Sequence, residues 1–287
     1  MASEQLFNKP ITEIITNRTS VRNYKAEEIS KELKDKLVNY ILNVQGPFGE
    51  KVYYKMIGKS NTSDVAGEKI GTYGVIKGAS YYIVGKVKKG KMDLEQFGYT
   101  LEKIILYATS LNLGTCWLGG TFKRSSFESI IDIKDDEILP AVTPIGYIEK
   151  KKRLLDSVMR LGAGSNNRKE WSELFFYKSF DNLLEKHESE DWSTALEMLR
   201  LAPSASNKQP WRIVKDSNKY HFFLRTSPGY SSALGYNIQR IDIGIAMCHF
   251  EMTMNELGVK GSWIMDSELS IELPQNTDYV ITWVGID

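Results

Sequence analysis

The sequence predicts an α+β fold that is repeated twice along the chain, with a mainly antiparallel sheet covered by helices in each half. Each half contains a long apolar helical pattern that ends at a glycine, at residues 97–114 and 241–258, and the two patterns lie roughly 144 residues apart. Each half also ends its last strand pattern in glycine, at residues 145–146 and 284–285. Two copies are too few for a solenoid, so we expect a fused dimer, in which one chain supplies both sides of an interface.

Composition and charge exclude several classes of protein. Hydrophobic residues make up 42% of the chain and charged residues 25%, as in ordinary globular proteins. Lys and Arg number 37 against 36 Asp and Glu, so a net charge of +1 offers no general attraction for nucleic acid. No run approaches the roughly 18 consecutive apolar residues of a membrane span, and the N-terminus lacks the apolar core of a signal peptide. We expect a cytoplasmic protein that acts on a small molecule and binds neither nucleic acid nor membrane.

The two cysteines and three histidines do not form a metal site. Cys116 and Cys248 are far apart and give no CxxC pair, and the histidines are scattered. No spacing typical of metal ligands results. We therefore expect reduced thiols and no metal.

In the first half, apolar spacing predicts a helix from about Glu4 to Asn17, which Pro10 should interrupt in its early turns. A second helix begins after Ser30, a good N-cap residue, and stops near Gly46-Pro47. Strands are predicted at residues 51–58, 80–87 and 139–148, and a long buried helix at residues 97–113.

Small polar residues at 161–167 indicate a linker between a first half, residues 1–160, and a second half, residues 168–287. In the second half the patterns predict an apolar aromatic segment, a helix, a hairpin, a second long helix and a final strand. These lie at residues 171–184, 191–201, 211–224, 241–257 and 278–284.

Two arginines and a serine follow the first helix in an RxSxR arrangement. If this piece is extended, Arg18, Ser20 and Arg22 share one face, because side chains alternate along a strand. Two guanidinium groups and a hydroxyl on one face suit a phosphate group. The alternative is a pair of surface arginines that bind nearby carboxylates.

The loop Leu201–Val214 joins a helix to a strand and is rich in polar side chains. Asn207 and Gln209 carry amides that both donate and accept, and Ser204 adds a hydroxyl. The loop could therefore hold a flat polar ligand. The alternative is an ordinary helix-to-strand turn.

Gly119 and Gly120 follow the first long helix and would let backbone N–H groups approach a ligand closely. Gly114 and Gly119 have P-loop spacing, but a glycine stands at position 120 where that motif needs lysine, so a nucleotide triphosphatase is excluded. No GxGxxG follows a strand, which argues against a Rossmann site.

Together, RTSVRNY, LNLGTCWLGG and APSASNKQPW resemble the signatures of the FMN-dependent nitroreductase family, over most of the chain and in its fused two-half branch. In that family all the signatures occur in one subunit and FMN lies at the dimer interface. Here the first half carries the RxSxR segment and the Gly-Gly turn, whereas the second carries the PSxxNxQPW loop. The resemblance therefore implies a nitroreductase-like pseudodimer with one FMN site per chain.

Carried over residue by residue, the resemblance implies three groups of FMN ligands. The phosphate ligands would be Arg18, Ser20, Arg22, Lys151 and Arg153. The second-half loop would contribute Pro203, Ser204, Ala205, Asn207 and Gln209, and the turn near the flavin N5 would contribute Leu118, Gly119 and Gly120. Thr72 and Tyr73 are also expected to bind the flavin, although many family members have an Asn and a Lys near this place. We expect this difference from the family to affect the electronic properties of the flavin ring.

The resemblance implies an FMN-dependent oxidoreductase with NAD(P)H as co-substrate. NAD(P)H would reduce bound FMN and leave, and a nitroaromatic, quinone or similar acceptor would then take the electrons in a ping-pong cycle. No acid–base side chain is required. The alternatives are an FMN-binding sensor or storage protein without turnover, which the missing Asn and Lys motivate, and a scaffold whose site has decayed. Since one chain could be self-sufficient, we expect a monomer rather than a homodimer.

Overall fold

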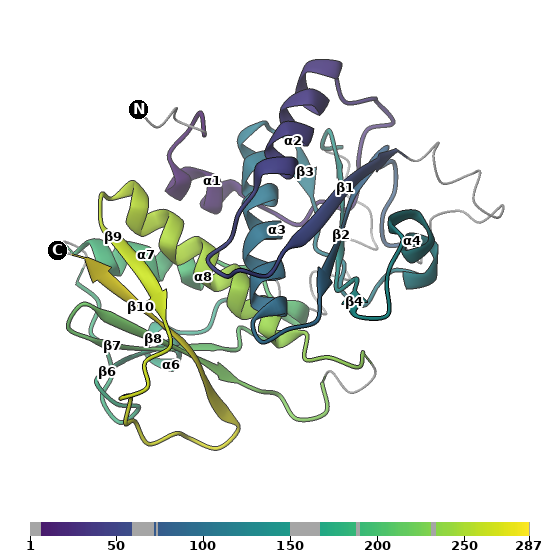
Figure 1. The fold of residues 1–287 in the computed structure, drawn as a ribbon. Coiled ribbons are helices and arrows are strands. Elements are labelled where there is room, and N and C mark those ends of the chain that lie inside the picture. Colours follow the sequence, from purple (N-terminus) through teal and green to yellow (C-terminus); the bar gives the residue numbers. More distant parts are fainter. Residues whose placement is uncertain are drawn as a thin grey trace. The chain divides into compact units, whose positions relative to one another are not determined.

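The structure, a computed structural model, describes residues 7–58, 72, 74–149, 167–187, 190–230 and 234–286. The chain divides into two compact units, Met1–Gly162 and Ala163–Asp287 (Figure 1). Of the expected linker, only Asn167 is among the described residues.

The first unit is a mainly antiparallel sheet with helices packed against it (Figure 1). The strand order is β1-β2-β5-β3, and β4 pairs with β2; every pair in this sheet is antiparallel. The helices are α1 (Ile11–Asn17), α2 (Lys31–Asn43), α3 (Asp93–Ser110) and α4 (Arg124–Ile131). The strands are β1 (Val52–Gly58), β2 (Tyr81–Lys88), β3 (Gly114–Thr115), β4 (Glu137–Ile138) and β5 (Val142–Gly146).

Strand β2 is central and has helices on both of its faces. Tyr82 packs edge-on against Phe127 of α4, with ring centroids 5.6 Å apart. On the opposite face, a Cβ on Gly85 would lie 2.8 Å from the ring of Phe97 in α3. Glycine at position 85 is therefore what allows α3 to lie this close to the sheet.

The second unit contains its own five-stranded sheet, in the order β6-β7-β8-β10-β9. Only β6 and β7 are parallel neighbours. The helices are α6 (Trp171–Leu174), α7 (Asp191–Arg200) and α8 (Gln239–Glu256), with a short 3-10 turn, η2, at Ala205–Asn207. The strands are β6 (Phe175–Tyr177), β7 (Trp211–Asp216), β8 (Lys219–Arg225), β9 (Lys260–Ile264) and β10 (Thr277–Ile286). Phe250 of α8 packs edge-on against Trp283 of β10 at 5.2 Å, in the core of this unit.

The prediction of mainly antiparallel sheets covered by helices is confirmed. The first helix is shorter than expected: it begins at Ile11, with Pro10 as its N-cap, rather than near Glu4. The reason is that a proline disfavours helical geometry in the residue before it, here Lys9. Residues 4–6 of the expected helix lie outside the described residues.

The two units share a specific contact in addition to their order of elements. Helices α3 and α8 each have 18 residues, and the side chain of the fourth residue of each forms hydrogen bonds with the backbone of a loop. Gln96 bonds the Phe48 N–H at 3.0 Å, the Phe48 carbonyl at 2.9 Å and the Glu50 carbonyl at 3.0 Å. Asp242 accepts the Ala205 N–H at 2.9 Å. The first loop follows α2 and the second follows α7, so in both units a long helix bonds the loop that joins another helix to a strand.

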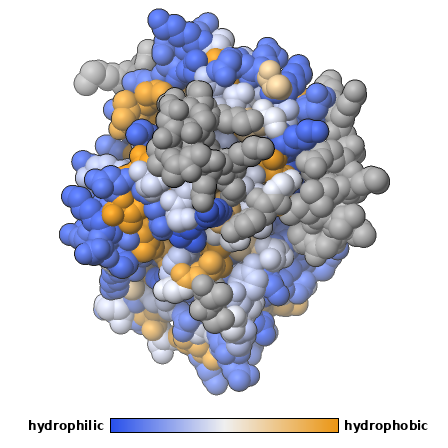
Figure 2. Space-filling model, turned by 90° about the vertical axis from the view of Figure 1, so that its right-hand side faces the viewer, coloured by the Kyte–Doolittle hydropathy of each residue, from blue (hydrophilic) through white to orange (hydrophobic). Residues whose placement is uncertain are grey.

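The face of the molecule in Figure 2 is mostly hydrophilic, and its hydrophobic side chains form separate small areas. Throughout the described ranges, every helix is too short or too polar to traverse a lipid bilayer.

Candidate functional site

The RxSxR segment leaves α1 as extended chain and pairs with β3, the short strand that follows α3. Arg18 has extended backbone angles (φ −61°, ψ 123°). Ser20 forms a parallel bridge with Thr115, and the Val21 N–H donates to the Thr115 carbonyl at 2.8 Å. Val21 and Asn23 are buried. Taken as whole residues, the three members of the RxSxR arrangement are partly buried: Arg18, Ser20 and Arg22.

Glu102 of α3 connects this segment with the glycine turn. Its buried carboxylate accepts a hydrogen bond from Trp117 Nε1 at 2.7 Å, and its other oxygen lies 3.8 Å from Arg18 Nε. Trp117 directly precedes the turn at Leu118. The same carboxylate therefore fixes the arginine segment and the start of the turn.

The guanidinium groups of Arg18 and Arg22 have unused hydrogen-bonding capacity. In the described part of the chain, the Nε atom of each is buried and has no hydrogen-bond partner. The Arg18 side chain is 7% exposed, and its contact with Glu102 is too long for a hydrogen bond. A buried donor without a partner is costly, so an anion placed here would be stabilised.

The glycine turn is anchored on one side and open on the other. Leu118 exchanges two backbone hydrogen bonds of 3.0 Å with Val142, and Arg124 Nη2 donates to the Gly119 carbonyl at 3.2 Å. Gly120 is exposed, and a Cβ built on it would meet no atom within 4 Å. Packing in the unit therefore does not require glycine at position 120.

The remaining expected residues of the first unit fall into two groups. Thr72 is buried, and its side chain bonds the hydroxyl of Tyr82, whose pKa is raised by burial to about 12. Thr72 thus helps to satisfy a core tyrosine. Tyr73, Lys151 and Arg153 lie outside the described residues. The described chain before Lys151 ends at Glu149, whose N–H donates to the Asn23 carbonyl at 3.1 Å, beside Arg22.

In the second unit, Gln209 shapes the polar loop from within. It is 3% exposed, and its Oε1 accepts the Lys169 N–H at 2.8 Å. Its Nε2 donates to the carbonyls of Asn167 and Asn207, each at 3.2 Å, and its N–H donates to Ser204 Oγ at 2.9 Å. The structure therefore gives the Gln209 amide and the Ser204 hydroxyl a role in holding the loop.

Asn207 is held by neighbours before α6. Arg168 donates from Nη1 to Asn207 Oδ1 at 2.7 Å and from Nη2 to the Leu201 carbonyl at 3.0 Å. Asn207 Nδ2 donates to the Asn167 carbonyl at 2.7 Å. The other two expected loop residues are half-buried: Pro203 and Ala205.

The loop backbone is strained. Three residues that are not glycine have positive φ: 47° at Ser206, 53° at Asn207 and 48° at Gln209. Such angles are uncommon for these residue types and persist only where neighbouring contacts hold them. The hydrogen bonds to Arg168 and Asp242 provide those contacts.

Asp242 is a buried carboxyl under this loop. Burial raises its pKa well above the usual range, against the opposing effect of the Ala205 N–H that it binds. Its second oxygen is buried without a partner among the described residues. Asp242 therefore holds the loop through the Ala205 N–H, and burial disfavours its ionisation.

The sequence reasoning missed Glu102, Asp242 and Arg168. For the first two, a signal exists: each is a carboxylate that directly follows an apolar core position of a long helix pattern, Leu101 or Ile241. Such a group is costly to bury and needs a specific partner. Arg168 has no comparable signal, because it lies in polar chain near the expected linker.

Glu102→Gln is expected to lower the free energy of unfolding by about 3 kcal/mol, because it leaves the buried Arg18 guanidinium without its carboxylate. Urea unfolding of the flavin-free chain measures this. The control is Glu32→Gln, which breaks an exposed ion pair with Lys36 and should change stability far less than Glu102→Gln does. Equal effects of the two substitutions would contradict the role given to Glu102.

No group of three or more His, Cys, Asp or Glu side chains among the described residues could hold a metal ion. The fold and its signature segments define a nitroreductase-fold protein built from two units. The chain belongs to the family described as "Putative TM nitroreductase", whose model matches residues 10–254.

A similar solved structure is a nitroreductase from Thermotoga maritima, with 19% identity and a TM-score of 0.62; the match covers 99% of this chain and 97% of that one. Shorter structures match about half of the chain. A nitroreductase with bound FMN from Desulfitobacterium hafniense has 18% identity and a TM-score of 0.41, covering 50% of this chain and 92% of that one. An FMN-dependent nitroreductase from Clostridium difficile has 19% identity and a TM-score of 0.39, covering 49% and 88%. A search of curated proteins finds no match.

Proposed function

We propose that the protein is an FMN-dependent oxidoreductase that passes electrons from NAD(P)H to a nitroaromatic, quinone or similar acceptor. The observation that carries this proposal is the pair of guanidinium groups at Arg18 and Arg22, each with a buried Nε that has no hydrogen-bond partner among the described residues. Because the chain belongs to the nitroreductase family, we interpret this pair of arginines as a phosphate site.

The residues present fit a flavin phosphate and ring. Arg18 and Arg22 supply two cations beside the Ser20 hydroxyl, which is the donor set that a phosphate dianion prefers. The open space at Gly120 leaves its backbone accessible to a ligand. Bound FMN would supply the hydride chemistry, accepting two electrons from a nicotinamide and passing them on.

The protein's own residues would bind and orient the flavin and polarise its ring. Arg18, Ser20 and Arg22 would hold the phosphate, together with Lys151 and Arg153. The backbone N–H groups of Gly119 and Gly120 would donate toward negative charge that develops on the ring, whereas the Leu118 N–H already donates to the Val142 carbonyl. The assignment of Pro203, Ser204, Ala205, Asn207 and Gln209 to the same flavin rests on the family resemblance.

A single site per chain follows from how the signatures are divided. The first unit's counterpart of the polar loop is Gln45–Gly49, which lacks the Asn and Gln. Its Phe48 is bonded on both sides by Gln96, and a Cβ on Gly46 would overlap that side chain. The Gln96 side chain therefore already occupies the space beside this loop and bonds its backbone.

A second candidate is an FMN-binding protein without turnover, a sensor or store. Thr72 favours it: this residue stands near the place of the family's ring-contacting side chains, but its own side chain bonds Tyr82 in the core. The two candidates differ in whether NADH or NADPH reduces the bound flavin.

The first measurement is an absorbance spectrum of the purified protein before and after anaerobic NADH and NADPH, with released flavin quantified per chain. We expect yellow protein with about one FMN per chain that bleaches with a nicotinamide. Yellow protein that stays unbleached would favour the sensor or store. Two FMN per chain would contradict the single site, and colourless protein that takes up no FMN would contradict both candidates.

A further inference from the structure

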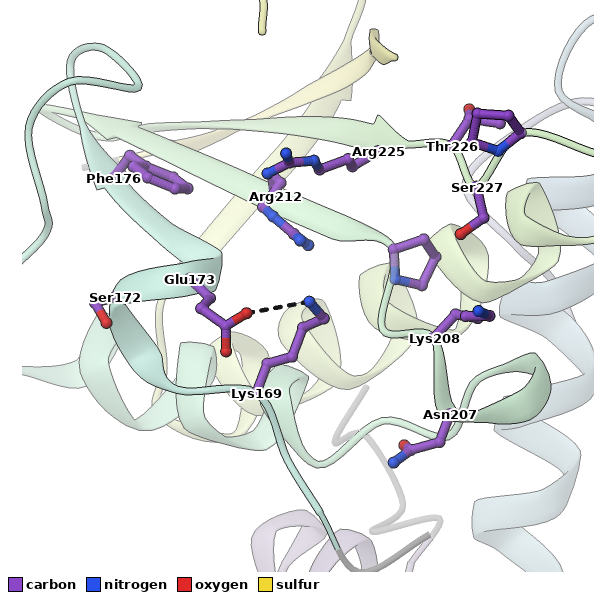
Figure 3. Close-up of a pocket in the computed structure, with 12 residues that line it drawn as sticks. Lys169, Ser172, Glu173, Phe176, Asn207, Lys208, Arg212, Arg225, Thr226 and Ser227 are labelled. Atoms are coloured by element: carbon purple, nitrogen blue, oxygen red, sulfur yellow. Dashed lines mark hydrogen bonds and ion pairs between the residues drawn. The ribbon is translucent and has the colours of Figure 1, made fainter. Parts of the chain in front are cut away.

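The second unit contains a cationic pocket, and Asn207 is the one described lining residue that the flavin assignment also uses. It has a volume of about 780 Å³ and lies where β7 begins and β8 ends (Figure 3). The two strands are antiparallel neighbours, and the Arg225 N–H donates to the Pro210 carbonyl at 2.8 Å. Arg212 of β7 and Arg225 of β8 therefore reach the same space.

The charges that line this pocket do not balance. Four cations line it: Lys169, Lys208, Arg212 and Arg225. Among the described residues the one lining carboxylate is Glu173, and it forms an ion pair with Lys169 at 3.2 Å (Figure 3). The pocket thus carries a net charge near +3.

Arg212 lines the pocket as a buried side chain, with only 5% of the residue exposed. Its Nη1 donates to the carbonyls of Gln209 at 3.1 Å and Trp211 at 2.6 Å, which fixes the guanidinium in place. Its Nε is buried with no hydrogen-bond partner in the described part of the chain. Burial, and then the charge of Arg225, lowers the pKa of Arg212 to about 10, so the group stays charged at neutral pH.

The lining also offers neutral contacts. Hydroxyls of Ser172, Thr226 and Ser227 lie around the pocket, and Phe176 contributes an aromatic face. A phosphate group is small compared with the whole space, so room remains for an organic group attached to it.

We propose that this pocket binds the phosphate group of a small phosphate monoester, with Arg212 and Arg225 as the principal ligands and the attached ring against Phe176. A dianion suits the site better than a carboxylate, because it neutralises more of the excess positive charge and accepts more hydrogen bonds. The proposal is independent of FMN, whose phosphate is assigned to the first unit.

The test measures the binding of inorganic phosphate, adenosine monophosphate and adenosine to the full chain by calorimetry at low ionic strength, since salt screens exposed charges. The protein carries Arg18→Ala and Arg22→Ala, which remove the other proposed phosphate ligands. We expect phosphate to bind, the monophosphate to bind more tightly, and adenosine to bind at least about tenfold more weakly than the monophosphate.

Two further variants locate the binding. Arg225→Gln changes an exposed side chain and should weaken phosphate and monophosphate binding by about tenfold or more. Lys260→Gln removes the same charge from β9, outside the pocket lining, and should leave binding unchanged. The proposal is overturned if neither anion binds, if adenosine binds as well as its monophosphate, or if the two variants behave alike. Flavin content with native Arg18 and Arg22 should be the same with and without Arg225→Gln, which separates this proposal from that of the flavin site.

Discussion

Replacing Arg18 and Arg22 together by alanine is expected to weaken FMN binding by about 100-fold to 10,000-fold, because each charged hydrogen bond contributes about 1.5–3 kcal/mol. Both side chains hold a buried Nε without a partner among the described residues, so an anion there gains contacts that water does not already supply. Flavin fluorescence during titration of the flavin-free variant measures the affinity.

The matched control removes the same charge elsewhere in the first unit. Lys31→Ala with Lys36→Ala changes two exposed lysines of α2 and should leave the affinity within about twofold. If the arginine variant still carries FMN at the native ratio, the phosphate site is assigned wrongly. If both double variants lose affinity equally, net charge rather than the RxSxR segment is responsible.

Asp242→Asn is expected to stabilise the protein above neutral pH, because asparagine carries no charge that burial would penalise. The pKa of Asp242 is raised in the folded state by burial, so the folded protein binds more protons than the unfolded chain. Native stability therefore falls as pH rises from the unfolded value near 3.8 toward the raised folded value. Asparagine keeps an acceptor for the Ala205 N–H and does not ionise.

Urea unfolding at pH 5 and pH 8 checks this prediction, since the gain should be larger at pH 8. Asp266→Asn is a control of opposite sign. Lys219 donates a hydrogen bond to Asp266 at 2.9 Å and lowers the pKa of that carboxyl. Its stability contribution is present above the unfolded pKa and is lost as pH falls through the folded value, so Asp266→Asn should destabilise at pH 8. A pH-independent effect of Asp242→Asn would contradict the burial of an acid under the loop.

Sequence patterns were sufficient for the strongly periodic elements. Helices α3 and α8 follow from long apolar runs, and β1, β2, β7, β8 and β10 follow from strand patterns, because burial of a whole face leaves a repeating signal. The short elements could not be predicted in this way. Strands β3 and β4 have two residues each, and their existence depends on partners far along the chain.

The candidate site could likewise be predicted only in part from the sequence. The segments containing Arg18 and Gly120 could be recognised from residue types and spacing. What the residues do within them could not, because it depends on tertiary contacts. Gln209 has the amide of a ligand-binding side chain, but that amide bonds the backbone of Asn207 in its own loop and of Asn167 and Lys169 before α6. Glu102 is one charge in an apolar helix until the fold places Trp117 and Arg18 beside it.

Gln96 and Asp242 occupy the same position in their helices, and this bears on which substitutions such a chain can accept. In an assembly of identical subunits, any substitution under one loop is also made under the other. Here, one copy has a neutral amide that bonds its loop through three backbone groups, whereas the other has an ionisable acid that makes a single bond. Two units in one polypeptide can therefore support their loops by different chemistry, a neutral amide in one and an acid with a raised pKa in the other, which identical subunits cannot do.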